Sequence, residues 1–195
     1  VGTLTHTCED ASILLKFMKG LDKRDPTSSN INPKNIDDFG MVDIKGKKIA
    51  VIGEILNERC DERIVTILKD RLKKLEKKGA IIDFVSMPII DYSVSIYYII
   101  ASAEASSNLG RYDGIRYGLR SGKKDVDAKT IFTHTRSEGF GDEIKRRIVM
   151  GNFVLSSGYT DAYYKKAQKA RIVLSNKFYE MFEKYDFIIT PTSPV

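Results

Sequence analysis

Residues 48–53 read Lys-Ile-Ala-Val-Ile-Gly and residues 80–86 read Ala-Ile-Ile-Asp-Phe-Val-Ser, and these two apolar runs decide the fold class. Each run has the length and β-branched content of a buried strand. Between them lies a helical pattern that Asp61 can cap and that Gly79 ends. Its apolar positions are Ile64, Leu68, Leu72 and Leu75. A strand, a helix and a strand in so short a stretch predict parallel pairing and a right-handed crossover, and therefore an α/β fold.

More helices and a last strand are predicted on either side of this unit. A capping motif at residues 7–10 begins a short amphipathic helix that Gly20 ends. Residues 93–109 are apolar nearly all round, which is typical of a buried helix. Three further elements are a short helix at 142–150 that Gly151 ends or interrupts, a long helix capped by Thr160 or Asp161, and a strand at 186–190 stopped by Pro191.

Two stretches are predicted to lack regular structure. Residues 21–46 are rich in Asp, Pro, Ser and Asn, which indicates a long irregular connection over a neighbouring surface. Residues 121–129 are polar and weakly structured. Because the chain begins with Val1 and stops directly after an apolar strand and Pro194, we expect both ends to be cut from a longer protein.

Composition and charge are those of a globular protein with a basic surface. Hydrophobic residues make up 42% and charged residues 30%, and the net charge is +6. No apolar run approaches the roughly 20 residues of a membrane span. The lysines are scattered, as in the pair Lys73-Lys74, and solvated helix faces explain them better than a nucleic-acid site.

The cysteines and histidines predict neither a disulfide framework nor a zinc site. The chain has only Cys8, Cys60, His6 and His134. Two cysteines and two histidines so far apart in sequence do not have metal-ligand spacing, so we predict no metal and a reducing, cytoplasmic setting.

Generic catalytic motifs are absent, and the serine pairs Ser106-Ser107 and Ser156-Ser157 have no recognisable base or oxyanion cradle, so we interpret them as structural.

Glu104 lies in the predicted buried helix with Asn108 four residues on. An internal ion pair with Arg111 or Arg116 is the favoured interpretation, and a catalytic carboxyl group with a shifted pKa is the alternative.

Arg147 is the best functional candidate by position. It lies three residues after Ile144, beside the apolar stripe of its helix. A planar guanidinium there suits a fixed carboxylate, but a helix pair with Glu143 at i−4 explains the position equally well. Arg146 is predicted to face solvent and pair with Asp142.

Tyr97 and Tyr98, on the predicted buried helix, are interpreted first as packed core residues.

Several long stretches are similar to one known family. They are Tyr97-Tyr-Ile-Ile-Ala-Ser-Ala-Glu-Ala-Ser-Ser-Asn-Leu109, Arg111-Tyr-Asp-Gly-Ile-Arg-Tyr-Gly118, Thr135-Arg-Ser-Glu-Gly-Phe-Gly141 with Lys145-Arg-Arg-Ile148, residues 155–169 and residues 188–194. On these residues the chain resembles the amidase-signature family, and within it the glutaminase subunits of glutamyl-tRNA(Gln) amidotransferases. The resemblance covers the whole chain, in the expected order. It implies a mixed β-sheet flanked by helices, with residues 1–195 as the middle-to-C-terminal part of a single domain.

The resemblance also implies an activity and its partners. Such subunits release ammonia from glutamine with a Ser–cis-Ser–Lys triad, and all three triad positions precede Val1, so we expect no catalytic residue in this chain and no activity from it alone. The ammonia would serve ATP-dependent amidation of Glu-tRNA(Gln), with ATP and Mg used by a partner. The B and C subunits are the expected partners, and no cofactor, no membrane and a cytoplasmic location are expected for the chain.

Two positions match the family's glutamine-recognition residues, the first tyrosine of Tyr97-Tyr98 and the second arginine of Arg146-Arg147. The resemblance therefore implies that Tyr97 and Arg147 bind substrate, Arg147 through the α-carboxylate of glutamine. Two alternatives remain open: a stand-alone amidase acting on small amides, and a basic tRNA-binding module whose affinity would fall steeply with salt.

Overall fold

The computed structural model describes residues 2–30, 43–124 and 126–195. The chain divides into two compact units, residues 1–43 and residues 44–195. Of the irregular connection predicted at 21–46, residues 31–42 lie outside the described part, and the described residues on either side of them contain no helix or strand.

The first unit contains α1 (Cys8–Met18), which confirms the predicted amphipathic helix. Thr7 caps it, because its hydroxyl oxygen accepts a hydrogen bond from the backbone amide of Asp10 at 3.1 Å. Glu9 and Asp10 add negative charge to the first turn, where the helix dipole is positive.

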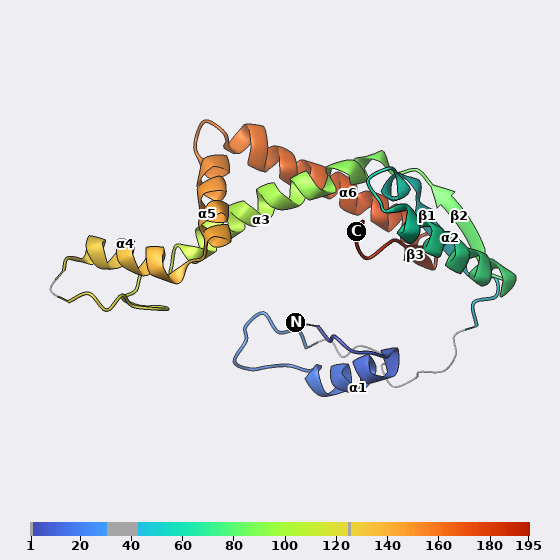
Figure 1. The fold of residues 1–195 in the computed structure, drawn as a ribbon, viewed down its shortest axis with the longest axis horizontal. Helices are drawn as coiled ribbons and strands as arrows, with labels where there is room; N and C mark the ends of the chain where they lie inside the picture. The colour runs from blue at the N-terminus through green and yellow to red at the C-terminus, as the bar shows by residue number, and fades with distance from the viewer. Residues whose placement is uncertain (1, 31–42, 125) are drawn as a thin grey trace. The chain divides into compact units, whose positions relative to one another are not determined.

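The second unit is built on a three-stranded sheet in the order β2-β1-β3, and both of its pairings are parallel (Figure 1). The strands are β1 (Lys48–Ile52), β2 (Ile81–Val85) and β3 (Phe187–Ile189). The central strand β1 supplies much of the core, since its residues after Lys48 are almost completely buried. This arrangement confirms the predicted α/β fold with a parallel strand-helix-strand unit.

The connection between β1 and β2 is α2 (Glu62–Lys77), which follows the short helix η1 (Gly53–Leu56). Asp61 caps α2 as predicted, accepting from the amide of Arg63 at 2.8 Å. The chain leaves α2 through Gly79, whose φ of +92° is one that side-chain-bearing residues rarely adopt. These two residues set the ends of α2 and so allow β2 to return parallel to β1.

The last strand, β3, is fixed to the sheet by the side chain of Asp186 as well as by its backbone pairing with β1. The carboxylate of Asp186 accepts from the backbone amide of Lys48 at 2.9 Å and from Nζ of Lys47 at 2.8 Å. The connection leading to β3 is therefore fixed beside the start of β1, although 138 residues separate Asp186 from Lys48.

Three helices form the rest of the packed part of this unit: α3 (Ser93–Leu109), α5 (Asp142–Leu155) and α6 (Lys166–Phe182). The short helix η2 (Pro88–Tyr92) leads into α3. In Figure 1, α3 and α6 run side by side and α5 crosses the far end of α3. Ile96 and Ile100 of α3 pack with Ala167 of α6 to make a second small core.

The helical prediction needs four corrections. A helix not predicted at all, α4 (Ala128–Gly139), begins inside the segment 121–129 that was predicted to be weakly structured. Helix α5 runs through Gly151 to Leu155, because the missing side chain of Gly151 lets it approach α3 closely. The long helix begins with a wider π-type turn, η3 (Thr160–Lys165). Finally, α3 is buried on one face only, and Val94 on its other face is 62% exposed.

Among the described residues, no helix combines the length and the apolar character needed to cross a bilayer.

Candidate functional site

The two residues expected to bind substrate lie together in the structure. Tyr97 stands on α3 and Arg147 on α5, 50 residues apart in sequence. Nη1 of Arg147 donates to the hydroxyl oxygen of Tyr97 at 3.4 Å. The packing of α3 against α5 produces this approach, since Gly151 on α5 meets Ser102 and Ser106 of α3 further along the same crossing.

The neighbouring tyrosine completes one side of the arginine. The guanidinium carbon of Arg147 lies 5.9 Å from the ring centroid of Tyr98, within the range of a cation–π contact. The rings of Tyr97 and Tyr98 meet edge to face with centroids 5.4 Å apart. Sequence reasoning gave Tyr98 no role beyond packing, and its only signal was its place beside Tyr97.

The predicted core packing of these tyrosines is wrong for this chain. Tyr97 is 54% exposed and Tyr98 is also exposed, because the buried residues of α3, such as Ile96, Ile100 and Ser106, lie on its other side. The Arg147 side chain keeps 27% of its accessible surface. The arginine and the two aromatic rings therefore form a surface site that a ligand can reach.

The helix pair predicted as the alternative for Arg147 is also present. Nε of Arg147 donates to Oε1 of Glu143 at 2.8 Å. Arg146 bonds the other oxygen of the same carboxylate, so its predicted pairing with Asp142 is wrong. Asp142 lies 3.8 Å from Lys145 instead. Four residues separate Arg146 from Asp142 and three separate it from Glu143; both spacings suit a helical pair, and the structure selects the shorter.

Both partners of this pair have shifted pKa values. The hydrogen bond to Tyr97 and then the one to Glu143 raise the pKa of Arg147 above its already high value. The hydrogen bonds from Arg147 and then Arg146 lower the pKa of Glu143. At neutral pH the site therefore contains a permanent cation with one anion beside it, and Arg147 can bind a planar anion such as a carboxylate.

The other titratable candidate from the sequence does not form the predicted ion pair. Glu104 lies on an exposed part of α3. Nε of Arg111 donates to the carbonyl oxygen of Asn108 at 3.0 Å, and Arg116 pairs with Asp113. Because α3 packs on one face only, Glu104 stays in water and needs no buried cation.

The serine candidates use their hydroxyl groups structurally. Ser106 donates to the side-chain oxygen of Asn152 at 2.6 Å, and Ser156 donates to the carbonyl oxygen of Phe153 at 2.8 Å. Neither bond reaches a histidine, lysine or carboxylate that could act as a base. In the described ranges, no group of three or more His, Cys, Asp or Glu side chains is placed to hold a metal ion.

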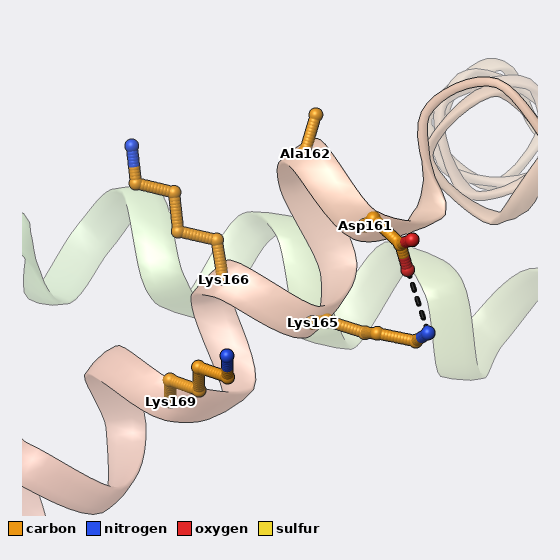
Figure 2. Close-up of a pocket in the computed structure, with 5 residues that line it drawn as sticks. All are labelled: Asp161, Ala162, Lys165, Lys166 and Lys169. Carbon is orange, nitrogen blue, oxygen red and sulfur yellow. Dashed lines mark ion pairs between the residues drawn. The ribbon is translucent and has the colours of Figure 1, made fainter.

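A separate hollow of about 650 Å³ lies on η3 and the start of α6 (Figure 2). Three lysines and one aspartate line it: Lys165, Lys166, Lys169 and Asp161. Oδ1 of Asp161 forms an ion pair with Nζ of Lys165 at 2.6 Å, while Lys166 points away from that pair. The hollow is therefore net positive. The pattern Lys-Lys-x-x-Lys was visible in the sequence, but sequence reasoning treated the lysines as scattered.

Comparison with known proteins settles the family. The model of the Amidase family matches residues 1–195. The chain belongs to the amidase family. Within this family it is 50% identical over 194 residues to the A subunit of the glutamyl-tRNA(Gln) amidotransferase of Listeria monocytogenes, and 48% identical over 197 residues to that of Clostridium botulinum. These alignments cover 100% of the amidase-family chain and 40% of each relative, so the chain spans about 40% of their length.

Solved structures agree with this assignment. The crystal structure of the corresponding glutamyl-tRNA(Gln) amidotransferase protein from Thermotoga maritima, also the A subunit, matches 100% of the amidase-family chain at 37% identity and a TM-score of 0.66, using 37% of its own length. A bacterial aryl acylamidase of the amidase-signature enzymes matches 94% of the chain at 16% identity and a TM-score of 0.65, which shows a shared fold. The fold class implied by the resemblance is thus confirmed.

Proposed function

We propose that this amidase-family chain forms the glutamine-binding part of the glutaminase subunit of a glutamyl-tRNA(Gln) amidotransferase. The observation that carries the proposal is the contact between Arg147 and Tyr97. Both residues are assigned to glutamine by resemblance alone, and Nη1 of Arg147 lies 3.4 Å from the hydroxyl oxygen of Tyr97. The names of relatives that are 48% and 50% identical support the same activity.

In this proposal Arg147 binds the α-carboxylate of glutamine and Tyr97 orients the substrate through its hydroxyl group. A guanidinium offers two parallel N–H groups to a carboxylate, which fixes the direction of the ligand as well as its charge. We place the nucleophile of the amide hydrolysis outside these 195 residues, because the family resemblance matches none of them to the Ser–cis-Ser–Lys triad. The hydrogen bonds that Ser106 and Ser156 donate to Asn152 and Phe153 support this placement.

The remaining partners follow from the same proposal. Ammonia released from glutamine would pass to a B subunit, which would use ATP and Mg to amidate Glu-tRNA(Gln), with a C subunit completing a cytoplasmic assembly. The chain itself would require no cofactor, since amide hydrolysis by a serine nucleophile needs none.

The test compares this chain with the complete subunit that contains it. Both are supplied with glutamine, and ammonia is measured with and without the partner subunits, ATP and Glu-tRNA(Gln). The complete assembly is expected to release ammonia and to form Gln-tRNA(Gln), while the 195-residue chain alone releases none. Ammonia production by the chain alone, abolished by Arg147→Ala, would overturn the placement of the nucleophile.

The complete subunit on its own separates a second enzyme class from this proposal. Efficient hydrolysis of small amides without the B and C subunits, together with no amidation of Glu-tRNA(Gln) in their presence, would favour a stand-alone amidase. The fold shared with the aryl acylamidase does not decide between the two, because 16% identity shows architecture and not substrate.

The lysine-lined hollow favours a further candidate, direct tRNA binding by this chain. Lys166 and Lys169 supply positive charge beyond what Asp161 balances. Each phosphate contact contributes about 0.9 to the slope of log affinity against log salt for duplex nucleic acid. Lys166→Glu together with Lys169→Glu should lower that slope for tRNA binding by the complete assembly, whereas Lys73→Glu with Lys74→Glu on α2 serves as the control. Equal salt slopes for the two double variants would exclude direct tRNA binding at this hollow.

A further inference from the structure

The carboxylate of Glu143 accepts hydrogen bonds from two arginines, Arg146 and Arg147, and it restrains the side chain of Arg147. Its Oε1 accepts from Nε of Arg147 at 2.8 Å, and its Oε2 bonds Arg146. Since both carboxylate oxygens are engaged, the carboxylate has little freedom to turn away from Arg147. Glu143 and its two partners lie on α5, so the helix itself sets their spacing.

The rest of the Arg147 guanidinium is placed by α3. Nη1 points to the hydroxyl group of Tyr97, and the plane lies near the ring of Tyr98. Within residues 2–30, 43–124 and 126–195, no hydrogen bond from Nη2 is formed. The edge formed by Nη1 and Nη2 is therefore the part of the fork that still has N–H groups to donate.

We propose that Glu143 is a positioning residue for the substrate carboxylate. By occupying Nε, it leaves the outer edge of Arg147 for glutamine and prevents the long side chain from sampling other rotamers. This inference rests on the proposed function and adds a role for a residue that does not itself touch the substrate.

Two effects of Glu143 on substrate binding oppose each other. Its negative charge offsets part of the arginine's attraction for a carboxylate, which would weaken binding. Its hydrogen bond removes rotamer freedom that the arginine would otherwise lose when glutamine binds, which strengthens binding. The positioning role requires the second effect to dominate, and two variants of Glu143 separate them. Glu143→Gln keeps an acceptor for Nε without the charge, and Glu143→Ala removes both.

The experiment uses the complete glutaminase subunit with its partners and two substrates. One substrate is glutamine, and the other is 4-aminobutanamide, which is glutamine without the α-carboxylate. Glu143→Ala should raise KM for glutamine about tenfold while kcat stays within about twofold, as expected when binding of the ground state and the transition state is lost equally. Its kcat/KM for 4-aminobutanamide should stay close to that of the unmodified subunit, which also shows that the variant folds.

The conservative variant and a matched control complete the test. Glu143→Gln should keep KM for glutamine within about threefold of the starting value, because an amide oxygen still accepts from Nε. Asp142→Asn removes a negative charge from the same first turn of α5 and should leave kcat/KM for both substrates unchanged. The inference is overturned by any of three results for Glu143→Ala. These are an unchanged KM for glutamine, an equal loss of kcat/KM for both substrates, or a KM for glutamine no higher than that of Glu143→Gln. Absence of glutamine hydrolysis by the unmodified assembly would instead overturn the proposed function, and this inference with it.

Discussion

At the scale of single residues, the shape of the cation at position 147 matters as much as its charge. Arg147 meets Glu143, Tyr97 and the ring of Tyr98 with different parts of one planar group. A lysine would keep the charge but present a single point of donation on a flexible stem. The surroundings of Arg147 therefore select for arginine.

We predict that Arg147→Lys in the complete subunit raises KM for glutamine about tenfold or more, since a hydrogen bond to a charged group contributes roughly 1.5–3 kcal/mol. The measurement is steady-state ammonia release over a range of glutamine concentrations. A KM within about twofold of the original would contradict bidentate recognition at this residue.

A second residue, Asp113, makes the stability of the chain depend on pH. Its carboxylate accepts from the backbone amides of Ile115 and Arg116, both at 2.9 Å, and from Nε of Arg116 at 3.1 Å. The amide of Arg116 and then that of Ile115 lower the pKa of Asp113 to about 2. Because the folded pKa lies below the unfolded one, the unfolded chain binds more protons in that interval.

The stabilisation from Asp113 is therefore fully present above the unfolded pKa near 4 and is lost as the pH falls toward about 2. Urea unfolding at several pH values should show a steeper loss of stability over this interval in the original chain than in Asp113→Asn. Parallel curves for the two proteins would show that this turn makes no such contribution.

At the scale of elements, the crossing of α3 and α5 depends on small side chains. A Cβ at Gly151 would overlap the carbonyl oxygen of Ser102 and lie 2.5 Å from Cβ of Ser106. Tyr97 and Arg147, the two residues proposed to bind substrate, lie on these same two helices, so the 3.4 Å contact between Nη1 of Arg147 and the hydroxyl oxygen of Tyr97 depends on the depth of this crossing.

Gly151→Ala should therefore lower the free energy of unfolding by about 1–3 kcal/mol, the usual cost of overpacking. It should also raise KM for glutamine in the complete subunit by separating the two helices. Gly158→Ala is the control, because a Cβ there meets nothing within 4 Å. Equal stability of the two variants would show that α5 can shift without cost.

The elements that the sequence predicts well are those with local signals. Asp61 and Gly79 mark the ends of α2, and the apolar runs around it form β1 and β2 as expected. Helix α4 was missed because few of its residues are apolar, although Asp127 caps it by accepting from the amide of Thr130 at 2.8 Å. That cap was a usable signal.

What could not be predicted depends on contacts between distant segments. Nothing in the sequence near Gly151 shows that α3 passes beside it, so the helix was expected to end or break there. The exposure of Tyr97 follows from which faces α5 and α6 cover. Family resemblance assigned Tyr97 and Arg147 to the same ligand, but their positions in the sequence carry no signal of the contact that they make with each other.

At the scale of the whole molecule, the chain exposes apolar and aromatic side chains on several helices. Examples are Val94 on α3, Val149 on α5 and Ile172 on α6. Exposed apolar surface of this kind marks contact regions or promotes association.

We accordingly predict that the purified 195-residue chain self-associates. Size-exclusion chromatography with light scattering should give a mass above 22.0 kDa that rises with protein concentration. A single species of 22.0 kDa at every concentration would show that these faces do not need a cover.

The most direct test of the central claim is a calorimetric titration of glutamine into the complete subunit. Arg147→Ala is compared with Arg146→Ala, which removes the same charge from the adjacent position of α5 at a more exposed side chain. Glutamine should bind the original protein and the Arg146 variant with affinities within about threefold, and should bind the Arg147 variant at least tenfold more weakly. Equal affinity of all three proteins for glutamine would contradict the claim that Arg147 binds the substrate.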